Sequence, residues 1–211
     1  MAGYEDLAKA VLKGEDDQVK SLTQSLIDSG KDFLEIINMG LIAGMDVVGA
    51  RFKKGEMFVP EVLMAARAMS EGINLVKPHI AEKDIPSLGK VLVGTVKGDL
   101  HDIGKNLLAM MMEGAGFTVV NLGVDISPEK FVEAAKEQKA DMIAMSALLT
   151  TTMPAMKDTI ELFKEEGIRD KVRIIIGGAP ISQEYANEIG ADGFAPDAAT
   201  ACDLAKGLLA K

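Results

Sequence analysis

Apolar residues recur at helical spacing through the first part of the chain. Between residues 32 and 55, for example, Ile36, Ile37, Leu41 and Met45 share one face of a helix. A glycine closes each of the first three amphipathic segments, where helices commonly end in a left-handed residue. The pattern predicts four helices with short connections, and hence an antiparallel four-helix bundle. The predicted helices cover residues 4–14, 15–30, 32–55 and 60–83.

The pattern changes after the stretch EKDIPSLG at 82–89, which we interpret as a linker between residues 1–88 and 89–211. Beyond it, short runs rich in β-branched residues alternate with amphipathic helical segments. Such alternation is typical of a parallel sheet covered on both faces, so we expect a doubly wound, five-stranded sheet of flavodoxin-like or Rossmann-like type. The fold class is therefore α+α/β, a helical bundle followed by an α/β domain. The expected strands are 90–96, 117–122, 141–147, 172–178 and 191–195, and the expected helices are 102–115, 127–137, 153–166, 181–189 and 198–210.

The composition is that of an acidic globular protein. Its 211 residues carry a net charge of -9 and only 4% are aromatic, which argues against binding to a phosphate backbone or to stacked bases. A single cysteine, Cys202, excludes an internal disulfide and a thiolate-rich metal site. The N-terminal stretch is acidic without an apolar signal core, and no window reaches about 18 uninterrupted apolar residues. We therefore expect a cytoplasmic protein that binds neither nucleic acid nor a membrane and that meets other proteins.

The first expected strand-to-helix turn, GDLHDIG at 98–104, contains His101 between Asp99 and Asp102. A carboxylate two residues before a histidine can accept a hydrogen bond from one ring nitrogen and leave the other for a metal. One imidazole without a cysteine or second histidine nearby does not make a closed zinc site, so a single axial bond to a metal held by a macrocycle matches better. Two other interpretations stay open at this point. His101 is either a solvated loop residue paired with Asp99, or a general acid or base whose partner is not evident.

Three further strand ends carry small or polar residues. The stretch SALLTTT places hydroxyls at Ser146, Thr150 and Thr152, IIIGGAP places Gly177 and Gly178 after the next strand, and ADGFAPDAAT ends the last. Each has an ordinary explanation, namely helix N-capping for the hydroxyls and a tight turn for the glycines. The carboxyl ends of parallel strands nevertheless meet at one edge of a sheet, where ligands bind. Together these residues predict a deep polar slot.

These motifs resemble the D-x-H-x-x-G, S-x-L and G-G signature of cobalamin-binding domains. The stretch 40–69 resembles the helical cap module of methionine synthase and of corrinoid methyltransferase proteins, so the resemblance covers residues 30–205. SALLTTTM, GGAPIS and GADGFAPDA are closest to the small corrinoid proteins that serve methylamine, betaine, methanol or methoxyaromatic methyltransferases. The matching signature residues are Asp99, His101, Gly104, Ser146, Leu148, Gly177 and Gly178.

The resemblance implies cobalamin bound with its own dimethylbenzimidazole displaced from cobalt. His101 is then the lower axial cobalt ligand, and Asp99 accepts a hydrogen bond from its other ring nitrogen. Thr152 supplies the hydroxyl that completes this relay, with a methyl group more than the serine of methionine synthase. The resemblance thus assigns the catalytic role to His101, Asp99 and Thr152.

The rest of the implied site divides among a slot, a loop and a lid. An apolar lid over the corrin is physically sensible, because reactive cobalt needs shielding from water and oxidants. The alternative for the lid residues is plain bundle core, since both roles look the same in sequence. The slot for the nucleotide tail comprises Ser146, Thr150, Gly177, Gly178 and Ala198, the loop comprises Gly98, Leu100, Asp102 and Gly104, and the lid comprises Phe52, Val59 and Val62; Leu148 of the S-x-L motif is a further cofactor-binding residue.

The function implied by the resemblance is that of a methyl carrier for one-carbon metabolism. Cobalt(I) accepts a methyl group from a substrate-specific methyltransferase, and methyl-cobalt(III) passes it to a second methyltransferase acting on tetrahydrofolate or a thiol coenzyme. A reductive activase is the further expected partner, and the chain alone is not expected to be catalytic. A cobalamin-dependent regulatory sensor and a mutase cobalamin subunit are the alternatives. The acidic first 30 residues leave little room for a DNA-binding module, and mutase subunits generally lack the cap.

Overall fold

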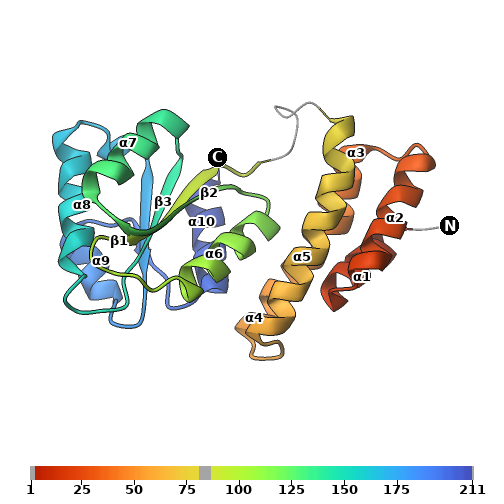
Figure 1. Cartoon of the computed structure of the whole chain (residues 1–211), viewed down its shortest axis with the longest axis horizontal. Helices are drawn as coiled ribbons and strands as arrows, with labels where there is room; N and C mark the ends of the chain where they lie inside the picture. Colours follow the sequence, from red (N-terminus) through yellow and green to blue (C-terminus); the bar gives the residue numbers. More distant parts are fainter. Residues whose placement is uncertain (1–2, 81–86, 211) are drawn as a thin grey trace. The chain divides into compact units, whose positions relative to one another are not determined.

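The computed structural model describes residues 3–80 and 87–210, which divide into two compact units (Figure 1). The first unit is built from the helices between Tyr4 and His79, and the second from the sheet and its helices after Leu88. Most of the predicted linker, residues 82–86, lies outside the described residues.

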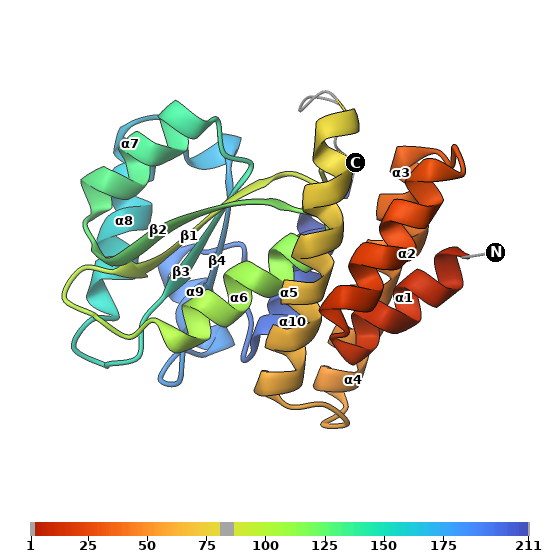
Figure 2. The same ribbon diagram turned by 45° about the vertical axis from the view of Figure 1, so that its right-hand side comes forward.

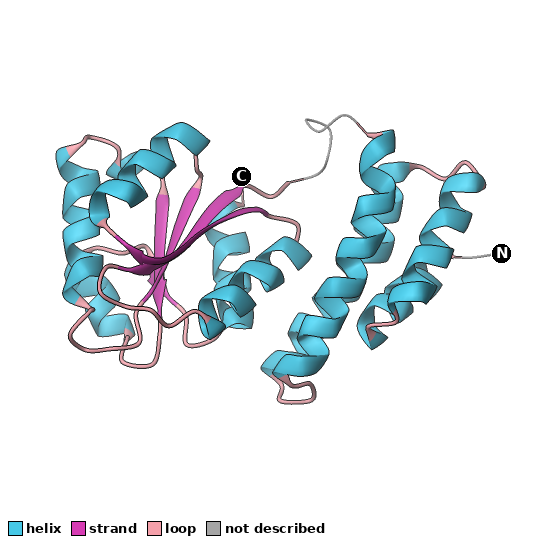
Figure 3. Cartoon of the chain, viewed as in Figure 1, coloured by secondary structure: helices cyan, strands magenta, loops and turns pink. Residues whose placement is uncertain are grey.

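The first unit consists of helices packed around an apolar core (Figure 3). Leu7, Val19, Leu41 and Val62 are all fully buried, as the amphipathic pattern requires. The elements are α1 (Tyr4–Lys13), α2 (Asp16–Asp28), α3 (Phe33–Glu35), the π-helix η1 (Ile36–Ile42), α4 (Ala43–Lys53), α5 (Val59–Val76) and the 3-10 turn η2 (Lys77–His79).

Two details of this unit differ from the sequence expectation. The third predicted helix is not regular, because it contains the seven-residue π-helical segment η1 between α3 and α4. The fourth helix ends at Val76 rather than at residue 83. Pro78 explains the second difference, since it lacks a backbone N–H and disfavours helical geometry at the residue before it. The segment 33–53 is also apolar and long enough to cross a membrane, by length and composition alone.

The second unit is a five-stranded parallel sheet in the order β2-β1-β3-β4-β5, the flavodoxin-like winding that the sequence predicted (Figures 1 and 3). Each strand is followed by a helix, so the carboxyl ends of the strands and the loops that follow them gather at one edge. The strands are β1 (Lys90–Val96), β2 (Thr118–Ile126), β3 (Met142–Ser146), β4 (Arg173–Gly177) and β5 (Gly193–Phe194). The helices are α6 (Ile103–Gly114), α7 (Pro128–Gln138), α8 (Pro154–Glu165), the turn η4 (Arg169–Lys171), α9 (Gln183–Ile189) and α10 (Ala198–Leu209).

Strand β2 runs four residues beyond its predicted end at residue 122. It continues beside β1 through two register shifts, pairing Gly94 with Gly123 and then Val96 with Ile126. A bulge of this kind needs unusual backbone geometry, which Asp125 supplies with a φ of 54°. The predicted strand ended before Gly123 because the alternation of apolar and polar residues is interrupted at a bulge.

The two faces of the sheet are covered by different helices (Figure 2). Helices α7, α8 and α9 cover one face over a core that includes Leu92, Phe131, Ile143 and Ile160. Helices α6 and α10 lie on the other face, where α10 places Leu204 against Gly193 of β5. The packing between α6 and α10 is incomplete, and the candidate site lies in the space between them.

Candidate functional site

Asp99 is the centre of the polar structure at the carboxyl edge of the sheet. It lies in the loop between β1 and α6, and its side chain is completely buried. Its Oδ1 accepts hydrogen bonds from the backbone N–H and the Nδ1 of His101, at 3.1 and 2.7 Å. Its Oδ2 accepts from the Leu148 and Leu149 backbone N–H groups, at 2.7 and 3.3 Å, and from Thr152 Oγ1 at 2.8 Å. One carboxylate therefore joins the β1–α6 loop to the β3–α8 loop.

The hydrogen bonds of Asp99 keep it ionised. Burial alone would raise the pKa of this carboxyl, but the bonds from Leu148, from the His101 ring and backbone, and from Thr152 together hold its pKa well below the ordinary value. An ionised carboxylate only accepts hydrogen bonds, so the bridging proton belongs to His101 Nδ1. The imidazole is then held in the tautomer whose Nε2 carries a free lone pair.

His101 presents that second nitrogen outward. Its side chain is half exposed, and no hydrogen bond to Nε2 is present within residues 3–80 and 87–210. Thr95 Oγ1 donates to the His101 carbonyl at 2.8 Å, so the backbone of the loop is fixed as well as the ring. The arrangement suits a metal ligand whose orientation is set by its neighbours.

The described residues contain no group of three or more histidine, cysteine, aspartate or glutamate side chains that could hold a metal ion. Among these residues His101 can therefore give a metal one bond, and a cofactor that carries its own metal ligands matches this donor. This donor set fits a corrin, which supplies the equatorial nitrogens of its own cobalt. It does not fit a closed site for a bare ion.

A cavity of about 510 Å³ opens beside His101, in the size range of ligand pockets. It lies over β3, β4 and the end of β5, between α6 and α10, and its walls are mostly apolar. The sequence prediction of a slot at this edge described its place correctly but overstated its polarity. The predicted site residues that line it are Leu100, His101, Asp102, Gly104, Ser146, Leu148, Gly177, Gly178 and Ala198.

The two glycines after β4 are needed by the backbone itself. Gly178 has a φ of 130°, and a Cβ added there would overlap the carbonyl oxygen of Ala147. A Cβ at Gly177 would lie 2.9 Å from the carbonyl oxygen of Ala195. These glycines therefore serve close packing of three chain segments as well as lining the cavity.

Other predicted residues lie elsewhere in the loops. Gly98 precedes Asp99 in the loop, and its backbone N–H donates a hydrogen bond to Asp125 Oδ1 at 2.7 Å. Thr150 is exposed and does not line the cavity. The N-capping explanation for the hydroxyls is wrong, because α8 has Met153 at its N-cap and no side-chain cap hydrogen bond. Thr152 instead donates to Asp99.

The three predicted lid residues differ in exposure. Val62 on α5 is completely buried, whereas Phe52 on α4 and Val59 on α5 are half-buried. The burial of Val62 agrees with the alternative interpretation as bundle core. The roles of all three toward a cofactor stay predictions.

Several residues of the site escaped the sequence analysis. Thr95 and Asp125 fix the loop backbone, yet a threonine inside a strand and an aspartate near the end of one carry no special signal. Lys105 is buried, with its Nζ on Asn106 Oδ1 and Asn121 Oδ1, both at 2.7 Å. The apolar lining was missed because it looks like core. It includes Leu108, Ala144, Ile175, Ala195 and Ala201.

Comparison with known proteins gives consistent matches along the chain. Two models of a B12 binding domain match, one over residues 4–77 and the other over residues 89–204. A corrinoid protein of Desulfitobacterium hafniense is 45% identical, over 100% of this chain and 99% of the relative. Dimethylamine corrinoid protein 1 of Methanosarcina acetivorans is 46% identical, over 98% of this chain and 97% of the relative. The crystal structure of the methanol:cobalamin methyltransferase complex from Methanosarcina barkeri matches with a TM-score of 0.89 and 34% identity, over 98% of this chain and 79% of that chain.

Proposed function

This chain belongs to the family of B12-binding corrinoid proteins, with cobalamin as its cofactor, and we propose that it carries methyl groups between two methyltransferases. Bound cobalamin supplies a cobalt centre that can accept and release a methyl group. The protein supplies position and electrostatics. The observation that carries the proposal is His101, with Nδ1 held by an ionised, buried Asp99 and Nε2 free beside an apolar cavity.

In this proposal His101 Nε2 would bind the cobalt of the corrinoid. Asp99 accepts the hydrogen bond from His101 Nδ1 and thereby orients Nε2, and Thr152 donates to the other carboxylate oxygen. The cavity receives the nucleotide tail of the corrinoid. Leu100 and Ile103 are 71% and 80% exposed next to His101, and contact with the corrin face would remove them from water.

The helical unit is proposed as the lid over the upper corrin face, with the half-buried Phe52 and Val59 among its contacts, whereas Val62 is buried in the bundle core. Its match to a B12 binding domain model over residues 4–77 supports this role. An apolar cover excludes water from a reactive metal.

A methyl carrier needs a donor enzyme and an acceptor enzyme. The structural relative from a methanol:cobalamin methyltransferase complex supports a methyltransferase as the first partner. We propose that the second is a methyltransferase acting on tetrahydrofolate or a thiol coenzyme, that a reductive activase restores inactive cobalt, and that the exchange takes place in the cytoplasm.

The test is the electron paramagnetic resonance spectrum of the cobalt(II) form after reconstitution of the full chain with cobalamin. Histidine is labelled with nitrogen-15, and a change in the nitrogen splitting places a histidine nitrogen on cobalt. The chain has two histidines, which gives a matched control. His101→Ala should abolish the label-dependent splitting, while His79→Ala, which removes a ring stacked on Phe33 at 5.1 Å, should leave it unchanged.

Nitrogen splitting that is the same with and without labelled histidine would mean that the corrinoid keeps its own base on cobalt. That result would overturn the ligand role of His101. Failure of the full chain to retain cobalamin would overturn the proposed function as a whole.

A further inference from the structure

The cavity beside His101 exists because a row of small residues crosses the sheet. Ser146 of β3 pairs in register with Gly177 of β4, and Ala195 follows β5 with its N–H on the Ile176 carbonyl. Residues paired in a parallel sheet point to the same face, so these three form one floor. The wall on α10 is also small, since Ala198 and Ala201 are one turn apart.

The inner part of this slot carries almost no hydrogen-bonding side chain. Ala144, Ile175 and Ala201 line it and are each at most 5% exposed. Ser146 contributes a hydroxyl with no hydrogen bond to the described part of the chain.

Asp102, Lys105 and Asp197 are the charged side chains that also line the cavity, and each has a hydrogen-bond partner among the described residues. Asp102 accepts a hydrogen bond from Asn106 at 3.2 Å. Lys105 donates to two asparagine oxygens, and Asp197 caps α10 through the N–H and hydroxyl of Thr200 at 2.8 and 2.9 Å. A polar ligand group beside Ala144, Ile175 and Ala201 therefore meets apolar walls and the free hydroxyl of Ser146.

We infer that this slot selects corrinoids by the polarity of their lower base, favouring a benzimidazole over a purine. This inference rests on the proposed function, in which the slot receives the nucleotide tail. The methyl groups of dimethylbenzimidazole match alanine and isoleucine side chains. The exocyclic amine of adenine would lose its water on entry and find too few acceptors to replace it.

The experiment measures dissociation constants of the full chain for three corrinoids, by ultrafiltration and absorbance. The three are cobalamin, the cobamide that carries adenine in place of dimethylbenzimidazole, and cobinamide, which has no base. We expect cobalamin to bind at least about tenfold more tightly than the adenine cobamide, the effect of leaving one buried donor unpaired.

Variants of β3 and β4 then test whether the slot is responsible for the selection. Ile175→Thr places a hydroxyl in the slot and should bring the dissociation constants for cobalamin and the adenine cobamide closer together, which lowers their ratio. Ile174→Thr is the matched control, because Ile174 is the adjacent buried residue of β4 and belongs to the core under the opposite face. It should leave the ratio unchanged. Ser146→Ala removes the one free hydroxyl and should widen the ratio.

Equal affinity for both cobamides, with cobalamin still bound, would overturn the inference and leave the proposed function standing. A preference that Ile175→Thr and Ser146→Ala do not change would also overturn it, because the selection would then arise outside the slot. Loss of binding to all three corrinoids, cobinamide included, would overturn the proposed function together with the inference.

Discussion

The two units of the molecule treat buried polar groups in opposite ways. In the sheet unit, the buried carboxylate of Asp99 accepts five hydrogen bonds from two loops. In the helical unit, buried oxygens of Glu15, Asp16 and Thr23 have no hydrogen-bond partner among the described residues. A buried polar group without a partner is costly, so a fully satisfied one indicates that the surrounding loops are built around it.

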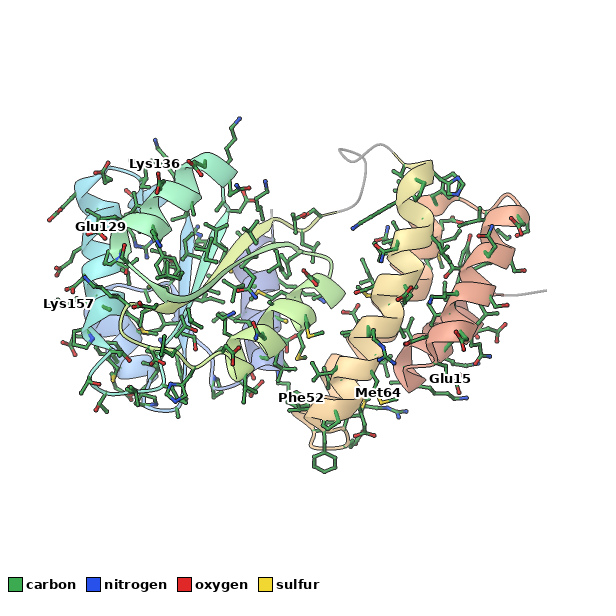
Figure 4. All side chains as sticks on the ribbon, viewed as in Figure 1. Glu15, Phe52, Met64, Glu129, Lys136 and Lys157 are labelled. Carbon is green, nitrogen blue, oxygen red and sulfur yellow. The ribbon has the colours of Figure 1, made fainter. Side chains whose placement is uncertain are left out.

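Close packing at glycines, in contrast, occurs in both units. The helical unit is held by close approach of helices at glycines, as where a Cβ at Gly44 would lie 2.8 Å from both Ala8 O and Val11 Cβ. Its polar and charged side chains are largely at the surface, as are Lys136 and Lys157 on α7 and α8 of the sheet unit (Figure 4). The difference in buried polar groups indicates that the chemistry of this protein is concentrated in the sheet unit, where such groups are paired. The helical unit contributes a packed helical scaffold.

The largest effect should come from Asp99→Asn. The amide nitrogen of asparagine would face donors that now point at a carboxylate, so we expect a loss of about 3–5 kcal/mol in the free energy of unfolding at pH 7. Urea denaturation measures this. Asp102→Asn, an exposed neighbour with one hydrogen bond at 3.2 Å, is the matched control and should change stability by less than about 0.5 kcal/mol.

The same variant should reveal the lowered pKa of Asp99. A carboxyl whose pKa is depressed in the folded state contributes stability that is fully present above its unfolded pKa, about 3.9, and is lost as the pH falls toward the folded value. The stability gap between the wild type and Asp99→Asn should therefore be constant from pH 7 to about pH 5 and shrink below about pH 4. A gap that widens on acidification would contradict an ionised Asp99.

Gly178→Ala tests whether the sheet unit needs this glycine for its backbone. The added Cβ meets the Ala147 carbonyl, which cannot move like a side chain, and the backbone conformation is unfavourable for alanine. We expect a loss of about 2–4 kcal/mol without any cofactor present, measured by thermal unfolding of the apo chain. If the stability of the apo chain did not change, the backbone would not require glycine at this position, and its role would be limited to lining the cavity.

Gly44→Ala is the corresponding test in the helical unit. Here the added methyl meets a backbone oxygen and a Cβ of α1, and we expect a loss of about 1–3 kcal/mol. Gly49→Ala in the same helix is the control, because nothing lies within 4 Å of its added Cβ. It should stabilise by about 0.5–1 kcal/mol through helix propensity. Equal effects of the two variants would contradict packing through Gly44.

One substitution made in both units compares their polar groups directly. Thr152→Val removes a hydrogen bond to a buried carboxylate and should cost about 1–2 kcal/mol. Thr23→Val removes a buried hydroxyl that has no hydrogen-bond partner, and should be neutral or stabilising by up to about 1 kcal/mol. Chemical denaturation of both variants gives the comparison, and a greater loss at Thr23 would reverse it.

Gly104→Ala should have the smallest effect on stability and separates structure from binding. Gly104 lies in helix α6 with nothing within 4 Å of an added Cβ, so we expect the apo chain to gain about 0.5–1 kcal/mol. The residue lines the cavity, and the methyl group should weaken cobalamin retention. Unchanged retention would remove Gly104 from the cofactor site.

Much of this architecture was determined by the sequence alone. The change from helical to strand periodicity predicted a bundle followed by a five-stranded parallel sheet, because burial of apolar side chains dictates both periods. The loop with His101 and Asp99 was identified because hydrogen bonding over two residues is local. Family motifs then indicated the cofactor, since their spacing reflects loops that meet at one edge.

Only the tertiary structure decided the contacts that join distant segments. The family resemblance had implied the contact of Thr152 with Asp99, but not the bonds from the Leu148 and Leu149 backbone, which cross about fifty residues of chain and have no local pattern that encodes them. The bulge in β2 and the π-helical η1 likewise depend on packing rather than on local preference. The apolar character of the slot was hidden because an alanine or isoleucine that lines a cavity has the same sequence pattern as one that fills a core. The distinction arises only when the opposing helix is placed and leaves the space empty.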